Sequence, residues 1–247
     1  MRTRMRRGAA AVLTASALCL TAVACGSEDD KKPSSSAEKD GAKDAASEKP
    51  AEDEKASTEP LTAAQMKAAT LELGDLPSGW TVNKVPAGDD PAPKADKPEC
   101  QPIADIFGDE IKGATKGGDV DFLQKSEKTE LSQHVFTFPG TGAADYVKAI
   151  DTALATCTTV PFDMAGTKVP VKIARVDAPK AGEASHAFTM TMEFAAGIEV
   201  KANMLIAHQG TGATRVAYKN DGGAEAQKNF ADLVTRVGDK LVKGATS

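Results

Sequence analysis

The feature that most constrains this chain is the composition of residues 26–60, which contain no Leu, Ile, Val, Phe, Trp or Tyr. The same stretch carries eleven acidic and six basic side chains. Without apolar area to bury, it cannot offset an ordering cost of about 1–2 kcal/mol per residue. We therefore expect residues 25–60 to form a disordered polar tether, which leaves residues 61–247 as a single globular domain.

The N-terminus has the pattern of an export signal. Four arginines lie within the first seven residues, and an apolar run over residues 8–24 follows them. This run is shorter than the roughly 20 apolar residues that cross a bilayer core, and small residues end it in place of a charged flank. Residues 1–24 are therefore predicted to be a cleaved signal peptide.

The apolar run ends in the residues LTAVACGS, positions 20–27. This pattern resembles the bacterial lipobox, although Ala22 stands where Leu is commoner. The resemblance implies that Cys25 becomes the acylated N-terminus, carrying palmitate-type chains that hold the protein at the outer face of the cytoplasmic membrane. The alternative is an ordinary secretory signal that happens to precede a cysteine.

Charge limits the class of partner. The formal charge of the whole chain is −5, and removal of the four signal-peptide arginines gives −5 − 4 = −9. An acidic chain of this kind lacks the counterion-release contribution that dominates binding to nucleic acid. Nucleic acid is therefore not expected as a partner.

Two cysteines remain outside the N-terminal region. Cys19 falls in the predicted signal peptide and Cys25 in the lipobox, which leaves Cys100 and Cys157. In an exported chain such a pair predicts one disulfide, whereas zinc would require further closely spaced Cys or His ligands.

The second half of the domain has the alternation of β-strands. Two apolar series alternate with polar residues and are separated by a turn at residues 195–197; they are Phe188, Met190, Met192, Phe194 and Ile198, Val200, Ala202, Met204, Ile206. A further turn at residues 209–212 leads into a strand over residues 214–219. The pattern predicts an antiparallel meander.

Helical periodicity appears at three main places. Residues 61–71 form a short helix that Thr62 can cap, and two longer apolar stripes follow the 3.6-residue repeat: Tyr146, Val147, Ile150, Leu154, Cys157 and Phe230, Leu233, Val234, Val237, Leu241. A helical turn after Cys100 and strands at residues 81–85, 119–125 and 130–138 complete the pattern. We predict an α+β fold with a mostly antiparallel twisted sheet of about five to seven strands packed by helices.

The sequence contains no recognised catalytic motif. His134, His186 and His208 are the only histidines and have no metal-binding spacing, although His186 and His208 share the parity of the apolar residues in their strands. Such histidines are more often satisfied by backbone carbonyls. Asp119 and Asp121 are expected on the wet face of a strand. No enzyme activity, metal or cofactor is predicted.

The methionine- and phenylalanine-rich stripe allows two interpretations. Phe188, Met190, Met192, Phe194 and Met204 can form ordinary core, which is the more frequent use of such residues. They can also form the adaptable lining of an apolar ligand cavity.

Three features together resemble the PknH-like extracellular sensor domain family, found on mycobacterial transmembrane kinases and in free-standing actinobacterial lipoproteins. They are the turn LPSGW at residues 76–80, Cys100 before a short helix, and Cys157 at the end of a longer one. The late strands and terminal helix, residues 188–241, follow the same order. The resemblance covers nearly all of residues 61–247, although this chain cannot form the second disulfide of the kinase-borne domain.

What the resemblance implies is a sheet with helices beside a cleft that binds an extracellular ligand without catalysis. We therefore expect an anchored lipoprotein that binds a small molecule or a cell-envelope protein. The alternative is a lipid or glycolipid carrier, which would require an apolar cavity of several hundred Å³.

Overall fold

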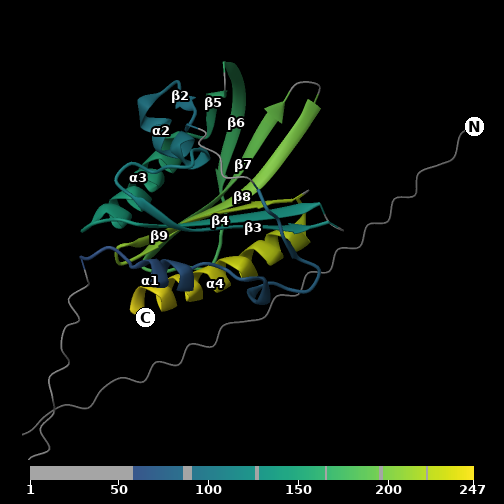
Figure 1. Ribbon diagram of the computed structural model, residues 1–247. Coiled ribbons are helices and arrows are strands. Elements are labelled where there is room, and N and C mark those ends of the chain that lie inside the picture. Colours follow the sequence, from purple (N-terminus) through teal and green to yellow (C-terminus); the bar gives the residue numbers. More distant parts are fainter. Residues whose placement is uncertain (1–57, 86–90, 126–127, 165, 195–196, 221) are drawn as a thin grey trace, which may run out of the picture. The chain divides into compact units, whose positions relative to one another are not determined.

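The computed structural model describes residues 58–85, 91–125, 128–164, 166–194, 197–220 and 222–247. The predicted signal peptide, the acylation site Cys25 and the tether as far as residue 57 lie outside these residues. Within the described part, an antiparallel sheet of nine strands has the order β1-β3-β4-β9-β8-β7-β6-β5-β2 (Figure 1). The α+β class is confirmed, with more strands than the five to seven predicted.

Seven strands form the body of the sheet, and two short ones lie at its edges. The bounds are β1 Thr81–Val82, β2 Lys94–Ala95, β3 Thr115–Gln124, β4 Thr129–Thr137, β5 Thr159–Met164, β6 Thr167–Arg175, β7 Ala184–Phe194, β8 Ile198–Gln209 and β9 Gly212–Lys219. In Figure 1, β5 and β6 run steeply whereas β3 and β4 run nearly horizontally, so the sheet is strongly twisted.

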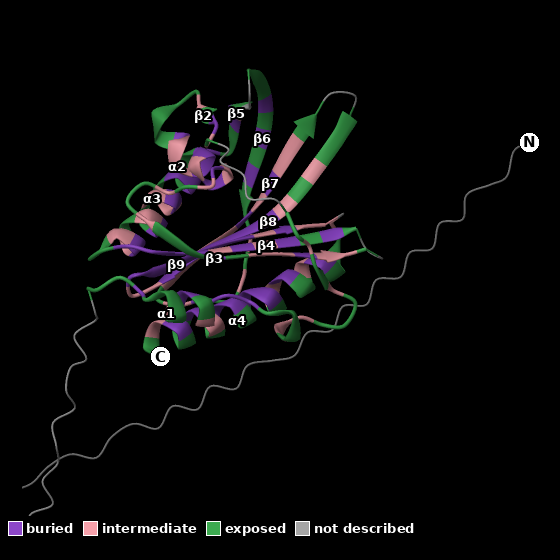
Figure 2. Ribbon diagram, viewed as in Figure 1, coloured by how far each residue is buried: buried purple, intermediate pink, exposed green. Residues whose placement is uncertain are grey.

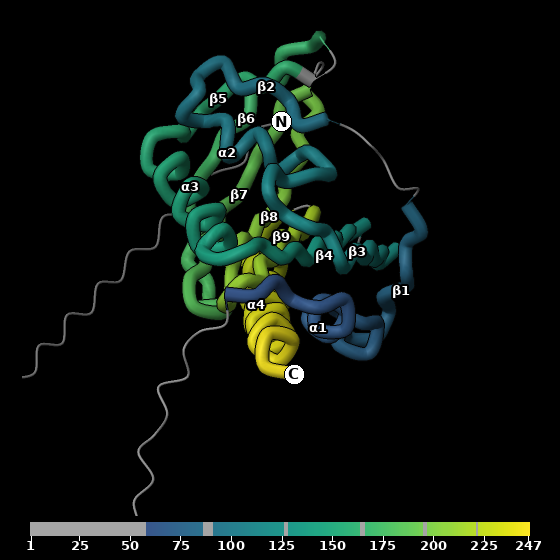
Figure 3. The backbone as a smooth tube through the Cα atoms, turned by 60° about the vertical axis from the view of Figure 1, so that its left-hand side comes forward, coloured from purple at the N-terminus to yellow at the C-terminus, as the bar shows by residue number. Residues whose placement is uncertain are grey.

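Helices cover both faces of this sheet. The α-helices are α1 Ala63–Ala68, α2 Gln101–Ala104, α3 Gly142–Thr156 and α4 Ala224–Thr246, and short 3₁₀ turns are η1 Leu73–Asp75, η2 Pro98–Cys100 and η3 Asp105–Phe107. Figures 1 and 3 show α1 and α4 together on one side, and α2 and α3 together on the other. The domain therefore has three layers.

Each face has its own hydrophobic core. The stripe of α4 is buried, with Phe230, Val234, Val237 and Leu241 fully enclosed. Helix α4 packs against α1, β8 and β9. On the opposite face, Val147 and Ile150 of α3 pack against the inward residues of β7 and β8. Figure 2 shows the buried residues concentrated along the centre of the sheet and the inner sides of the helices. On both faces of the sheet, a helix stripe that repeats every 3.6 residues therefore packs against strand residues that repeat every two.

Helix α1 begins at the residue that the sequence indicates. Thr62 and Gln65 form a capping box, in which the Gln65 amide nitrogen donates to Thr62 Oγ1 at 3.3 Å and the Thr62 amide nitrogen donates to Gln65 Oε1 at 2.9 Å. The helix lies so close to β3 that a Cβ at Gly117 would stand 2.2 Å from Met66 Cε. Glycine at this position therefore allows α1 to reach the sheet.

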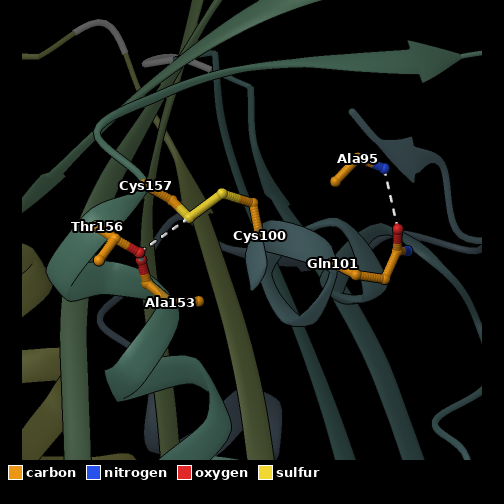
Figure 4. The surroundings of a disulfide bond; sticks show 6 residues. All are labelled: Ala95, Cys100, Gln101, Ala153, Thr156 and Cys157. Carbon is orange, nitrogen blue, oxygen red and sulfur yellow. Dashed lines mark hydrogen bonds between the residues drawn. A yellow bond between two sulfur atoms is a disulfide. The ribbon is translucent and has the colours of Figure 1, made fainter. Parts of the chain in front are cut away.

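A disulfide joins Cys100 to Cys157, with their Cα atoms 5.9 Å apart (Figure 4). Both cysteines are 2% exposed. Cys100 ends η2, immediately before α2, and Cys157 caps the C-terminus of α3. The bond therefore fixes α2 and the following η3 turn to the helix that packs on β7 and β8.

The structure differs from the sequence prediction in two places. The strand expected at residues 81–85 is confined to β1, Thr81–Val82, where it pairs with the edge of β3. Strands β5 and β6 were not predicted, and they account for most of the additional width of the sheet. The predicted turn at residues 195–197 lies partly outside the described residues, whereas Gln209 and Gly212 close the β8–β9 turn as expected.

Candidate functional site

A cleft of about 350 Å³ opens on the sheet face that carries α2 and α3. Its floor consists of residues from β3, β4, β9, β8 and β7, and Ile106, Phe107 and Asp109 of the segment around η3 line it as well. The volume lies at the low end of the roughly 300–1,000 Å³ typical of small-molecule sites. The cleft is the strongest candidate for a binding site among the described residues.

One end of the cleft is apolar. Met190, Met192 and Met204 line it together with Val200 and Ala202. Met190 and Met204 are also part of the hydrophobic core, with 1% and 5% exposure. The methionine stripe thus serves as core and as cleft lining at once, whereas Phe188 is core and Phe194, at 40% exposure, lies outside both.

The other end of the cleft contains a buried arginine. Arg215 of β9 is 5% exposed; its Nη1 donates to the carbonyl oxygen of Gly108 at 2.9 Å, and its Nη2 lies 3.2 Å from His134 Nδ1. The guanidinium also lies 5.5 Å from the centre of the Phe136 ring. None of these partners is a carboxylate, so the positive charge is not neutralised by direct contact within the described residues.

His134 of β4 is neutral near pH 7. Burial, followed by the positive charge of Arg215, lowers its pKa to about 4, and Asp119 opposes this shift. Because arginine only donates, Nδ1 of His134 is the acceptor in this contact, and the ring proton is on Nε2, 3.8 Å from Asp119 Oδ1. His134 therefore adds no positive charge beside Arg215.

Most of the acidic groups around the cleft have a lysine partner. Lys116 Nζ lies 2.8 Å from Asp119 Oδ2 and 4.0 Å from Asp109 Oδ1. Lys219 Nζ lies 3.0 Å from Glu130 Oε1. Two lysines thus contact three carboxylates around the cleft, with Lys116 shared by Asp109 and Asp119.

Asp121 of β3 differs from these carboxylates. It lines the cleft and is half-buried, and within the described residues its side chain forms no hydrogen bond or salt bridge. Burial is the main cause that raises its pKa; the charges of Asp119 and Glu130 act in the same direction, whereas the charge of Lys116 acts against them. The wet face predicted for Asp121 is therefore only partly exposed, because Asp121 lines the cleft together with Ile106 and Phe107 of η3.

The other two histidines lie on the same sheet face but do not form a joint site. His186 stands opposite Ile206, two residues from His208 on the neighbouring strand. His186 Nδ1 lies 3.3 Å from Asp151 Oδ1, and His208 Nδ1 lies 3.5 Å from Glu183 Oε2. Each histidine thus faces a carboxylate of its own, and the described residues contain no group of three or more potential metal ligands.

The LPSGW turn lies on the opposite side of the sheet from the cleft. Trp80 packs against Tyr218 with ring centres 6.4 Å apart, and Leu76, Pro77 and Leu233 of α4 line a small hollow around it of about 190 Å³. The motif therefore joins the segment before β1 to α4 and β9.

Two important cleft residues, Arg215 and Asp121, were not identified as site residues from the sequence. A signal for Arg215 was present, because it alternates with Ala213 and Ala217 on the inward side of a predicted strand. A charged residue at such a position is costly to bury and often has a functional explanation.

The sequence and the fold of this chain were compared with those of known proteins. No family model matches the chain, and no curated protein matches it. The crystal structure of the extracellular domain of PknH from Mycobacterium tuberculosis matches with a TM-score of 0.54 and 14% identity, covering 77% of this chain and 99% of that one. The chain has the PknH extracellular-domain fold.

A second solved structure, of an uncharacterized protein from Mycobacterium smegmatis, matches with a TM-score of 0.44 and 12% identity over 76% of this chain and 100% of that one. The match to the PknH extracellular domain confirms the PknH-like fold expected from the LPSGW turn and the two cysteines. In the described residues of this PknH-like domain, no helix is both long and apolar enough to span a membrane.

Proposed function

We propose that the domain is a non-catalytic, extracytoplasmic binding module that holds a small ligand in the cleft beside the sheet. The observation that carries this proposal is a cleft with an apolar end at Met190, Met192 and Met204 and a polar end at Arg215. Such a combination of apolar lining and a few convergent polar groups is typical of ligand sites. The likeness to a domain described as extracellular supports the location.

Blocking the cleft tests this function. Ala202 lies on its floor and is half-buried, so Ala202→Trp should fill the apolar end and abolish retention of any ligand that co-purifies with the protein. Lys201→Trp is the matched control, because Lys201 is the exposed neighbour on the same strand. Native mass spectrometry compares the two variants, and equal ligand retention in both would contradict a binding role for the cleft.

A lipid or glycolipid carrier is the second candidate, and the apolar end of the cleft favours it. The volume of about 350 Å³ favours a small ligand instead. Organic-solvent extraction of the purified protein, followed by mass spectrometry, separates the two. Reproducible recovery of a lipid from the unmodified chain, and not from Ala202→Trp, would favour the carrier.

We also propose that Cys25 anchors the chain to the outer face of the cytoplasmic membrane. The lipobox-like residues 20–27 and the polar composition of residues 26–60 support this proposal. Two acyl chains provide the double signal that stable anchoring requires. We expect Cys25→Ser to move the protein from the membrane fraction to the soluble fraction, and an intact mass without acylation in the unmodified protein would exclude the anchor.

A further inference from the structure

The cleft contains two charged groups of opposite sign that lack an oppositely charged contact, Arg215 and Asp121. We infer that its ligand is an apolar zwitterion, an α-amino acid or a short peptide with free termini, whose carboxylate binds Arg215 and whose ammonium group binds Asp121. The apolar side chain then lies on the methionines of the other end. This inference rests on the proposed function and specifies the chemistry of the same site.

The arginine has capacity for a carboxylate. A guanidinium carries five N–H donors, and the contacts to Gly108 and His134 use two of them within the described residues. A carboxylate at this end would supply the acceptor oxygens that the remaining donors lack.

Asp121 has capacity for an ammonium group. Its neighbours Asp119 and Glu130 each have a lysine partner, so Lys116 and Lys219 are already engaged. A half-buried carboxylate without such a partner destabilises the protein when it is charged. A bound ammonium group would remove this unfavourable term, and the gain would appear as ligand affinity.

The register places the two groups at a suitable separation. Asp119, His134 and Arg215 face each other across β3, β4 and β9, and the next row on the same face contains Asp121 and Ser132. With strands about 4.8 Å apart and residues about 3.4 Å apart along a strand, the Cα atoms of Asp121 and Arg215 are about 12 Å apart. Both side chains stand on the same face of the sheet, so we infer that an amino acid or a dipeptide bridges them.

The pairing of signs also defines what the cleft should reject. A simple anion bound to Arg215 would leave the carboxylate of Asp121 without a partner. A simple cation bound to Asp121 would likewise leave the guanidinium of Arg215 without a partner. Unpaired buried charges of this kind discriminate strongly between related ligands. Selectivity for the doubly charged form is therefore the property to measure.

Calorimetric titration of the purified protein tests the inference with L-leucine, L-methionine and L-leucyl-L-leucine as probes. Each probe is compared with capped forms that lack one charge. For leucine these are N-acetyl-leucine, which lacks the ammonium group, and leucinamide, which lacks the carboxylate. We expect each capped form to bind about tenfold to hundredfold more weakly than the zwitterion, because one charge-assisted contact is lost. The free amino acids and the dipeptide distinguish a monomeric from a peptide ligand.

Asp121→Asn is the decisive variant. It removes a half-buried, repelled carboxylate, so it should fold with at least the original stability and yet lose the preference for a free amino group. Asp96→Asn is the control, since that carboxylate also has a lysine partner, Lys168, but does not line the cleft. The control should retain the affinity for leucine within about twofold.

Three results would overturn the inference: equal binding of N-acetyl-leucine and leucine, unchanged affinity in Asp121→Asn, or no binding of any probe at about 10 mM, a concentration above the weakest specific affinities. None of these would refute the proposed function itself. That proposal fails only if Ala202→Trp retains the co-purifying ligand as well as Lys201→Trp does.

Discussion

Replacing both Cys100 and Cys157 by Ala is expected to lower the free energy of unfolding by about 4 kcal/mol. The bond closes a loop with a sequence separation of 57 residues, and in the chain-entropy model a loop of this size is strongly restricted in the unfolded state. For a domain of this size the midpoint of thermal unfolding should fall by about 10 °C.

Urea denaturation of the double variant and of the unmodified protein measures this effect. The unmodified protein in the presence of a thiol reductant is the control, and it should approach the stability of the variant. The two cysteines are almost fully buried, so slow reduction before unfolding is expected. A double variant with unchanged stability would show that the disulfide does not constrain the unfolded chain.

The second large effect is expected at Gln133, a fully buried polar residue of β4. Its Oε1 accepts from the Leu71 amide at 2.7 Å, and its Nε2 donates to the carbonyl oxygen of Ala69 at 3.2 Å. Gln133→Met preserves the shape but leaves these two backbone groups without their partner. With a cost of about 1–3 kcal/mol for each buried unsatisfied group, the variant should lose about 3 kcal/mol of stability.

Chemical denaturation of Gln133→Met and Gln209→Met gives the comparison. Gln209 makes an exposed hydrogen bond to Glu183, so its replacement should change stability by less than about 0.5 kcal/mol. If Gln133→Met were as stable as Gln209→Met, the link between the chain after α1 and the sheet would have no energetic role.

Long periodic segments were predicted well from the sequence. The stripe of α4 is buried as expected, and the alternating residues of β7 and β8 pair directly, with Phe188 opposite Met204. In both cases one residue pattern determines the exposed and buried sides, and a shift of one residue would place apolar side chains in water. Local pattern and tertiary packing agree in these elements.

Strands β5 and β6 were missed for an identifiable reason. Each contains a proline, and Pro161 stands opposite Pro170 in the sheet. Proline removes a ladder donor and normally argues against a strand, which weakens the β pattern of Val169, Val171 and Ile173. These strands lie near an edge of the sheet, where the missing donors are better tolerated.

The site was only partly accessible from the sequence. The methionine-rich lining followed from strand periodicity, because neighbouring inward residues share one face. The polar end depends on which strands are neighbours: Arg215, His134 and Asp119 are far apart in the chain and meet only because β9 pairs with β4 and β4 with β3. Such long-range pairing is not encoded in any local pattern.

The first described residues enter the domain at the β8–β9 turn, with consequences for how it bears mechanical load. Thr211 Oγ1 donates to the Glu59 carbonyl oxygen at 2.8 Å, and the Gly140 amide donates to the Thr58 carbonyl oxygen at 3.0 Å. The far end of β8, twelve residues long, is about 40 Å away. A pull on the N-terminal side would be borne first by these few bonds and by α1, while the cleft on the other face would keep its shape.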